Sequence, residues 1–185
     1  MKCMIISGSR NPEGQTARAQ GALAKGVTEA GGGCETLHLP AMKIERCRQC
    51  DAAGWGTCRS EGRCVIDDDF AAVVKKLRYA DAAVFATPVY WGDLAESLRA
   101  FGDRLRRTSV HEEGKRGFAG KPAVGICVAG GGGGGAPACT VALERVLRTI
   151  GFDVIDLVPV RRQNLDFKLD ILRRTGEWLV AETMS

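Results

Sequence analysis

Five short apolar runs, each leading into a stretch with helical periodicity further along the chain, set the strongest limit on how this sequence can fold. The second run alternates apolar and polar residues, which predicts a half-exposed strand near a sheet edge. The runs cover residues 3–7, 34–39, 82–86, 123–128 and 152–160. Helices are predicted at residues 16–30, 70–77, 94–105, 143–150 and 165–182. Strands that alternate with helices favour βαβ units and a parallel sheet covered on both faces.

Five such units in 185 residues suit one architecture well. The fold class predicted is α/β, a doubly wound, flavodoxin-like sheet of five parallel strands in the order 2-1-3-4-5, with helices on both faces. The length fits a single domain covering residues 1–185, with a cysteine-rich insertion at about residues 44–67.

Charge and hydropathy exclude several classes of partner. The net charge is +4, and the Lys and Arg residues are scattered, so no nucleic-acid partner is expected. No apolar run approaches the roughly 20 residues of a membrane span, and the apolar N-terminal run is too short for a signal peptide. We therefore expect a soluble cytoplasmic protein. In that reducing compartment, clustered cysteines indicate metal or redox chemistry more than disulfides.

Ligands of doubly wound sheets bind at the carboxyl ends of the strands, so the loops after the first, third and fourth strands are the candidate site. The first loop reads G-S-R-N-P-E-G-Q-T over residues 8–16 and opens into a helix. Free N–H groups and the positive end of the helix dipole would favour an anion there, and Arg10 could add charge-assisted bonds. The alternative is that Ser and Thr only cap the helix.

The other two loops carry different signals. The third-strand loop, T-P-V-Y-W-G-D over residues 87–93, has two adjacent aromatic residues that could flank a flat heterocycle or could fill the core. The fourth-strand loop contains six consecutive glycines, residues 130–135. A backbone without side chains can approach a ligand closely, although a flexible surface loop is the competing interpretation.

The motifs G-S-R-N-P-E-G-Q-T, T-P-V-Y-W-G, R-A-F-G-D-R-L and G-K-P-A-V-G-I-C-V-A-G-G together resemble those of the NADPH-dependent FMN reductase-like flavoproteins, over residues 1 to about 157. The cysteine segment, which ends in C-V-I-D-D-D-F, resembles their iron–sulfur flavoprotein branch. The resemblance implies FMN as cofactor, NAD(P)H as cosubstrate, a homodimer or homotetramer, and a redox protein as a further partner. The FMN-binding positions that it implies are Ser9, Arg10, Asn11, Gln15, Thr16, Pro88, Val89, Tyr90, Trp91, Gly92, Ala129, Gly130 and Gly131.

Four cysteines form the candidate metal site, with the spacing Cys47-x2-Cys50-x7-Cys58-x5-Cys64. Four thiolates suffice for a [4Fe–4S] cluster. A structural zinc site is the second interpretation, although the second pair lacks the usual knuckle spacing. The third is reduced thiols or a partial disulfide in a segment that serves as a lid or interface. The remaining four cysteines fit small buried apolar positions.

No catalytic residue is predicted, because hydride transfer from a nicotinamide to a flavin needs no dedicated acid or base. The leading function is an FMN-dependent oxidoreductase that uses NAD(P)H, of the flavin or quinone reductase type. The alternative is an electron carrier with FMN and a [4Fe–4S] cluster, reduced by a protein partner. A third hypothesis is a zinc-stabilised binding module without enzymatic activity.

Overall fold

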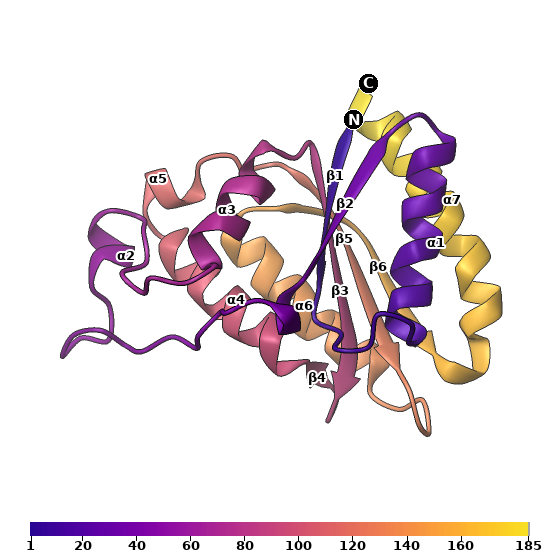
Figure 1. Cartoon of the computed structure of the whole chain (residues 1–185), viewed down its shortest axis with the longest axis horizontal. Coiled ribbons are helices and arrows are strands. Elements are labelled where there is room, and N and C mark those ends of the chain that lie inside the picture. The colour runs from indigo at the N-terminus through magenta and orange to yellow at the C-terminus, as the bar shows by residue number, and fades with distance from the viewer. Residues whose placement is uncertain (185) are drawn as a thin grey trace.

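The computed structural model describes residues 1–184, which form a parallel sheet between two layers of helices (Figure 1). The sheet order is β2-β1-β3-β5-β6, and these are the five strands expected from the sequence in their predicted order. The flavodoxin-like arrangement is therefore confirmed, with β2 at an edge and only partly buried. The strands are β1 Lys2–Ser7, β2 Gly33–His38, β3 Ala82–Tyr90, β4 Asp93–Leu94, β5 Pro122–Ala129 and β6 Asp153–Arg161.

The helices cover the two faces unequally. Helices α1 and α7 pack on one face, and α3, α4 and α6 pack on the other. The helices are α1 Gln15–Glu29, α2 Thr57–Ser60, α3 Phe70–Tyr79, α4 Glu96–Thr108, α5 Glu112–Lys115, α6 Ala136–Ile150 and α7 Leu165–Met184, with 3-10 turns at Leu39–Ala41 and Arg162–Asn164. In the described residues, no helix is both long enough and apolar enough to cross a membrane.

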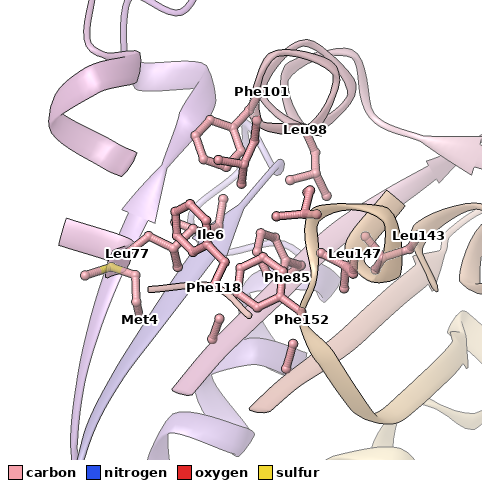
Figure 2. Close-up of a cluster of buried hydrophobic side chains, with 14 of the residues drawn as sticks. Met4, Ile6, Leu77, Phe85, Leu98, Phe101, Phe118, Leu143, Leu147 and Phe152 are labelled. Carbon is pink, nitrogen blue, oxygen red and sulfur yellow. The ribbon is translucent and has the colours of Figure 1, made fainter. Parts of the chain in front are cut away.

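The apolar run of β1 is buried on both faces of the sheet. Met4 and Ile6 belong to the cluster beneath α3, α4 and α6, whereas Cys3 and Ile5 belong to the cluster beneath α1 and α7. Figure 2 shows the first cluster, in which aromatic rings from β3, the loop before β5 and the residue before β6 meet. The ring of Phe152 lies 5.3 Å from that of Phe85 and 5.4 Å from that of Phe118. Burial on both faces explains the unbroken apolar runs.

Helices α1 and α7 contact each other through their backbones. A Cβ added at Gly26 would lie 1.9 Å from the carbonyl oxygen of Arg173, and one added at Gly176 would lie 2.2 Å from that of Leu23. Glycine is therefore required at both positions for this close approach. The contact fixes α1, whose N-terminus follows the first loop of the candidate site.

Three sequence-based boundaries were wrong. Leu94 was expected at the start of a helix, but it lies in β4, and α4 begins at Glu96. Residues 87–90 were expected in a loop, but β3 continues to Tyr90 and pairs antiparallel with β4 through Val89–Leu94 and Tyr90–Asp93. Only Trp91 and Gly92 form the turn. The β-branched and aromatic residues Thr87, Val89 and Tyr90 suit a strand, so β propensity outweighs the proline between them. Helix α6 also begins earlier than expected, at Ala136, directly after the glycine run.

Candidate functional site

The three loops chosen from the sequence meet at one edge of the sheet. Strands β1, β3 and β5 are neighbours, so the loops after them lie side by side. The Gly8 amide donates to the Ala86 carbonyl over 2.8 Å, which ties the first loop to β3. At the other end, a Cβ added at Gly135 would lie 2.8 Å from the Cα of Gly92, so these two backbones contact each other closely.

The first loop is held by its own hydrogen bonds. The Ser9 hydroxyl donates to the Asn11 carbonyl over 3.2 Å, and the Asn11 side-chain oxygen accepts from the Glu13 amide over 2.9 Å. The Gly14 amide donates to the Asn11 carbonyl over 3.3 Å. Asn11 therefore shapes this turn, which leads the chain into α1.

The N-terminus of α1 is left open toward this loop. Its first residue is Gln15, its N-cap is Gly14, no side chain of the described residues caps it, and its first turn contains no acidic residue. The alternative that Ser or Thr merely caps this helix is therefore wrong. The first backbone N–H groups of a helix have no partner inside it, and they carry the positive end of the dipole. These groups fit an anion. The Gln15 side-chain oxygen, an acceptor, is buried without a partner in residues 1–184, so it is suited to a donor group of a ligand rather than to the anion itself.

The hydroxyl residues Ser9 and Thr16 lie near the N-terminus of α1, and Arg10 lies on the surface beside it. Ser9 and Thr16 are buried, with 6% and 4% of their surface exposed. The Arg10 side chain is 80% exposed and lies 3.5 Å from the equally exposed Glu96 carboxylate. A weak surface pair of this kind leaves Arg10 free to turn toward an anion.

Tyr90 and Trp91 are placed differently by the β3–β4 turn. Tyr90 is half exposed and lines a cavity of about 310 Å³ with Gly8, Arg10 and Ser97. Trp91 is fully exposed and has a φ of 55°, in the left-handed region. The turn is anchored below by Thr87, whose hydroxyl accepts from the Ala95 amide over 2.9 Å. Tyr90 therefore faces the first loop, whereas the side chain of Trp91 is exposed to solvent.

The glycine run forms a turn with open space beside its backbone. The Gly133 amide donates to the Gly130 carbonyl over 2.7 Å, and the Gln163 side chain donates to the Gly132 carbonyl over 3.2 Å. A Cβ added at Gly130, Gly131 or Gly132 would meet no described atom within 4 Å. This backbone is therefore free to contact a ligand at the edge of the sheet.

All four cysteines of the candidate metal site line one small cavity, which we call the cysteine cavity. Two arginines of α4, Arg104 and Arg107, line it as well, and each has a buried Nε atom with no hydrogen-bond partner among the described residues. The ring of Trp55 covers Arg107, with the guanidinium carbon 4.3 Å from its centroid. Within residues 1–184, no three His, Cys, Asp or Glu side chains converge closely enough to hold a single metal ion.

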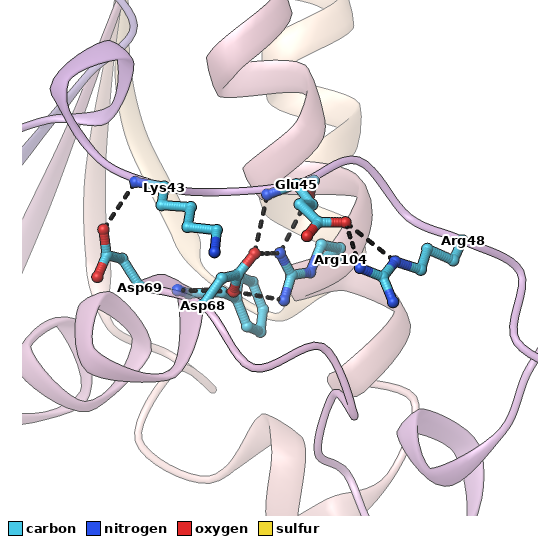
Figure 3. A network of polar contacts seen from close by, with 7 residues as sticks. Lys43, Glu45, Arg48, Asp68, Asp69 and Arg104 are labelled. Atoms are coloured by element: carbon cyan, nitrogen blue, oxygen red, sulfur yellow. Dashed lines mark hydrogen bonds and ion pairs between the residues drawn. The ribbon is translucent and has the colours of Figure 1, made fainter.

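A buried ion pair holds the first part of the cysteine segment against α4 (Figure 3). Arg104 donates to both carboxylate oxygens of Asp68, over 2.6 and 2.9 Å, and their side chains are 1% and 0% exposed. Asp68 also accepts from the Glu45 amide over 2.8 Å and the Phe70 amide over 3.1 Å. The Arg104 guanidinium also donates to the Glu45 carbonyl over 3.0 Å and lies 4.2 Å from the Phe70 ring centroid.

These surroundings shift the pKa values of two groups in opposite directions. Burial opposes ionisation of Asp68, but the hydrogen bonds from Arg104 and the two backbone amides outweigh it and lower its pKa. Burial raises the pKa of the Cys58 thiol, and the nearby Cys47 and Cys50 thiols act in the same direction, while Arg107 opposes them. The thiols of Cys47, Cys50 and Cys58 therefore lie close enough to influence one another.

Comparison with known proteins identifies the family. The model of the NADPH-dependent FMN reductase family matches residues 1–163. The chain belongs to this family of FMN-binding flavoprotein reductases. The expectation drawn from the four loop and helix motifs is thus confirmed.

The chain is also similar to proteins named iron–sulfur flavoproteins. One from Methanocaldococcus jannaschii is 31% identical over 131 residues, covering 71% of this chain and 65% of that protein. One from Methanosarcina thermophila is 34% identical over 122 residues, covering 64% of this chain and 61% of that protein. The matched regions therefore span less than two thirds of these relatives.

A solved structure with the same fold is that of an NAD(P)H:quinone oxidoreductase from Methanothermobacter marburgensis. It has a TM-score of 0.70 and 21% identity, and the match covers 97% of this chain and 96% of that one. An archaeal flavodoxin has a TM-score of 0.65 and 12% identity, with full coverage of both chains. These two structures support the fold.

Sequence reasoning missed three residues of the cysteine cavity in this FMN reductase family member: Trp55, Arg104 and Arg107. One signal was available for Arg104, which lies three residues after Phe101 on the apolar stripe of α4. A charged residue on a buried stripe needs a partner, and the only acidic run before that helix is 67–69. Arg107 and Trp55 left no comparable signal, because their approach depends on the irregular path of residues 46–66.

Proposed function

We propose that this protein is an FMN-dependent oxidoreductase that accepts hydride from NAD(P)H. The observation that carries the proposal is the open N-terminus of α1, which has no acidic residue in its first turn and lies beside buried Ser9 and Thr16. A phosphate fits such a helix end, because backbone N–H groups and the dipole both favour negative charge. The family membership makes FMN the phosphate-bearing ligand.

FMN, when bound, supplies the capacity to accept a hydride and to pass electrons on singly. The protein would hold its phosphate through the α1 N-terminus, Ser9 and Thr16, with Arg10 turning in from the rim. The backbone of Ala129, Gly130 and Gly131 and the turn at Tyr90 would border the flavin ring. Pro88 and Val89 lie in β3 beneath this turn and would position it. No side chain is needed as an acid or base, so the described groups bind and orient the cofactor.

The test is steady-state oxidation of NADH and NADPH by the FMN-loaded protein, under anaerobic conditions with an artificial electron acceptor. Turnover well above that of free FMN at the same concentration is expected. Flavin that stays bound without supporting any such turnover would contradict hydride transfer from a nicotinamide, and would leave electron transfer from a protein partner as the function.

A second candidate function, an iron–sulfur electron carrier, is favoured by the cysteine cavity. Cys47, Cys50, Cys58 and Cys64 would bind the irons of a [4Fe–4S] cluster, and Arg104 and Arg107 bring unpaired N–H donors of the described chain to the same cavity. Such donors suit a cluster, whose thiolate and sulfide sulfurs carry negative charge and accept hydrogen bonds. The donor set therefore fits this group.

The same geometry favours a cluster over zinc. A zinc ion needs four sulfurs at about 2.3 Å from one point, whereas each cysteine of a [4Fe–4S] cluster binds a different iron. In the described residues the thiols share a cavity without converging on one point. The free volume between their side chains is about 20 Å³, so the residues that line the cavity would have to move apart to admit a cluster.

The two candidates are separated by iron and acid-labile sulfide assays on anaerobically purified protein. Roughly four irons and four sulfides per chain would support the carrier. Stoichiometric FMN without iron would leave the plain reductase. Zinc without FMN would support the binding module instead and would contradict both.

A further inference from the structure

A second cavity lies directly behind the cysteine cavity. It encloses about 450 Å³ between α3, residues 62–64 and residues 116–117, and we call it the α3 cavity. Cys64 and Thr108 line both cavities. On α4, Thr108 lies eleven positions after Ser97, which is beside the flavin loops, and this corresponds to roughly 16 Å of helix. The α3 cavity therefore lies beyond the cysteines as seen from the candidate flavin site.

The charged groups that line the α3 cavity are all cationic: Arg63, Lys75, Arg78 and Arg116. No Asp or Glu is among the described residues that line it. Arg63 and Arg116 form surface ion pairs with Glu61 and Glu113. Such pairs are weak and open readily to a competing anion.

Arg78 is held by neutral groups rather than by a carboxylate. Its terminal nitrogen donates to the backbone carbonyls of Glu113 and Gly114, over 2.9 and 3.1 Å, and its guanidinium carbon lies 5.5 Å from the Phe118 ring centroid. Within residues 1–184, its buried Nε has no hydrogen-bond partner and no carboxylate lies within ion-pair distance. A guanidinium held in this way favours a negatively charged ligand.

The rest of the wall is apolar apart from the hydroxyl groups of Tyr79 and Thr108. Phe70, Ala71 and Val74 line it along α3. The volume falls in the range of pockets for small organic molecules, which combine an apolar lining with a few fixed polar groups. Cations together with an aromatic and aliphatic wall match a flat apolar molecule that carries an anionic substituent.

We propose that the α3 cavity binds a small aromatic anion of the quinone class, and that this is where such an acceptor receives electrons from the protein. The binding site follows from the cavity itself. Its role rests on both candidate functions holding together, hydride transfer from NAD(P)H to FMN and a [4Fe–4S] cluster on the cysteines, because only a redox group held at Cys64 would bring electrons to this wall. The balance is NAD(P)H plus quinone plus one proton giving NAD(P)⁺ plus hydroquinone. Two electrons would reach the quinone without protons, so the quinone takes up two protons from solvent while the reduced flavin releases the proton of the hydride and the one it took up, which leaves a net uptake of one proton.

The test uses anthraquinone-2-sulfonate as the probe and the FMN-loaded full chain as the protein, with affinity measured by isothermal titration calorimetry. Lys75→Glu reverses a charge in the lining, and Ala71→Phe fills the cavity. Lys76→Glu is the matched control, since it makes the same charge change one residue along α3 but does not line this cavity. We expect one site in the wild type, at least roughly ten-fold weaker binding in the first two variants, and unchanged binding in the control.

The variants distinguish binding in the α3 cavity from binding at the flavin and from a general charge effect. No binding, or binding that Lys75→Glu and Ala71→Phe leave unchanged, would overturn the site, because the probe would then be absent or stacked at the flavin. If Lys76→Glu weakened probe binding as much as Lys75→Glu, the loss would be a general effect of charge, and this result would also overturn the proposed site. Binding does not require iron, so it holds or fails independently of the cluster. Reduction of the bound probe by NAD(P)H at the same rate in wild type and Lys75→Glu would overturn the electron-transfer role alone.

Discussion

Replacing Asp68 with Asn tests whether the buried ion pair positions the cysteine segment. Asn keeps the shape of the side chain, but its single oxygen can accept from only one of the Glu45 and Phe70 amides, which donate to different oxygens of Asp68, and it cannot neutralise Arg104. The side chains of both partners are almost fully buried, so the variant leaves a guanidinium charge without a counter-charge. Removing one partner of a buried pair costs about 3–5 kcal/mol. Each kcal/mol lowers Tm by about 2–4 °C in a chain of this size, so a drop of about 6–20 °C is expected.

The assay is thermal and urea unfolding followed by circular dichroism, with Asp69→Asn as the control. Asp69 accepts one hydrogen bond, from the Lys43 amide over 2.7 Å, and has no ion pair in the described residues. Its replacement should cost about 1 kcal/mol. A second variant, Asp68→Leu with Arg104→Met, removes both charges and should recover most of the loss. A loss of under about 1 kcal/mol in Asp68→Asn, or an equal loss in Asp69→Asn, would refute the reasoning.

The ion pair between Asp68 and Arg104 also determines how stability should change with pH on the acid side. The pKa of Asp68 is lower in the folded protein than in the unfolded chain, so its ionised form stabilises the fold at pH values above about 4. That contribution is lost as the pH falls from about 4 through the folded-state pKa. The wild type should therefore lose stability over this interval more steeply than Asp68→Asn. Parallel pH profiles of the two proteins would contradict the assignment.

Three further perturbations test other parts of the account. Ser9→Ala with Thr16→Ala should weaken FMN binding by about 1–3 kcal/mol in a fluorescence titration, and unchanged binding would show that the phosphate lies elsewhere. Gly26→Ala should lower the free energy of unfolding by about 1–3 kcal/mol or more, because the added Cβ would clash at the α1–α7 contact. Gly21→Ala on the same helix is the control: its Cβ would meet no described atom within 4 Å, so the free energy of unfolding should rise by about 0.5–1 kcal/mol. Similar changes for the two variants in urea unfolding would contradict the packing argument. Arg107→Gln should lower the midpoint potential of a bound cluster in a redox titration, because it removes a positive charge and N–H donors near the sulfurs, and an unchanged potential would place Arg107 outside the redox site.

Much of the fold could be predicted from the sequence because the parallel strands are buried on both faces. Such strands appear as short apolar runs, and β1 and β5 were located within one residue at each end. The β3–β4 hairpin was missed because Pro88 and Gly92 indicate a turn, whereas the pairing of Val89 with Leu94 depends on a contact across that turn. Helix α6 was placed too late because the small residues at its start carry no amphipathic signal.

Part of the candidate site could likewise be predicted from the sequence, and part could not. The three loops at the carboxyl edge could be predicted, since the strand order alone brings them together. The open N-terminus of α1 could not be foreseen in detail, because whether Ser9 or Thr16 caps the helix depends on the turn that Asn11 closes. The arginines of the cysteine cavity were missed because the segment that covers them has no periodic structure from which contacts could be inferred.

The central claim is that the three loops at the carboxyl edge hold FMN, and the most direct measurement is the flavin content of the anaerobically purified protein. After gel filtration, the flavin released by denaturation is identified by chromatography and divided by the protein concentration. The account predicts FMN at about one molecule per chain. Protein that carries no flavin, and that binds none when FMN is added in excess, would contradict it.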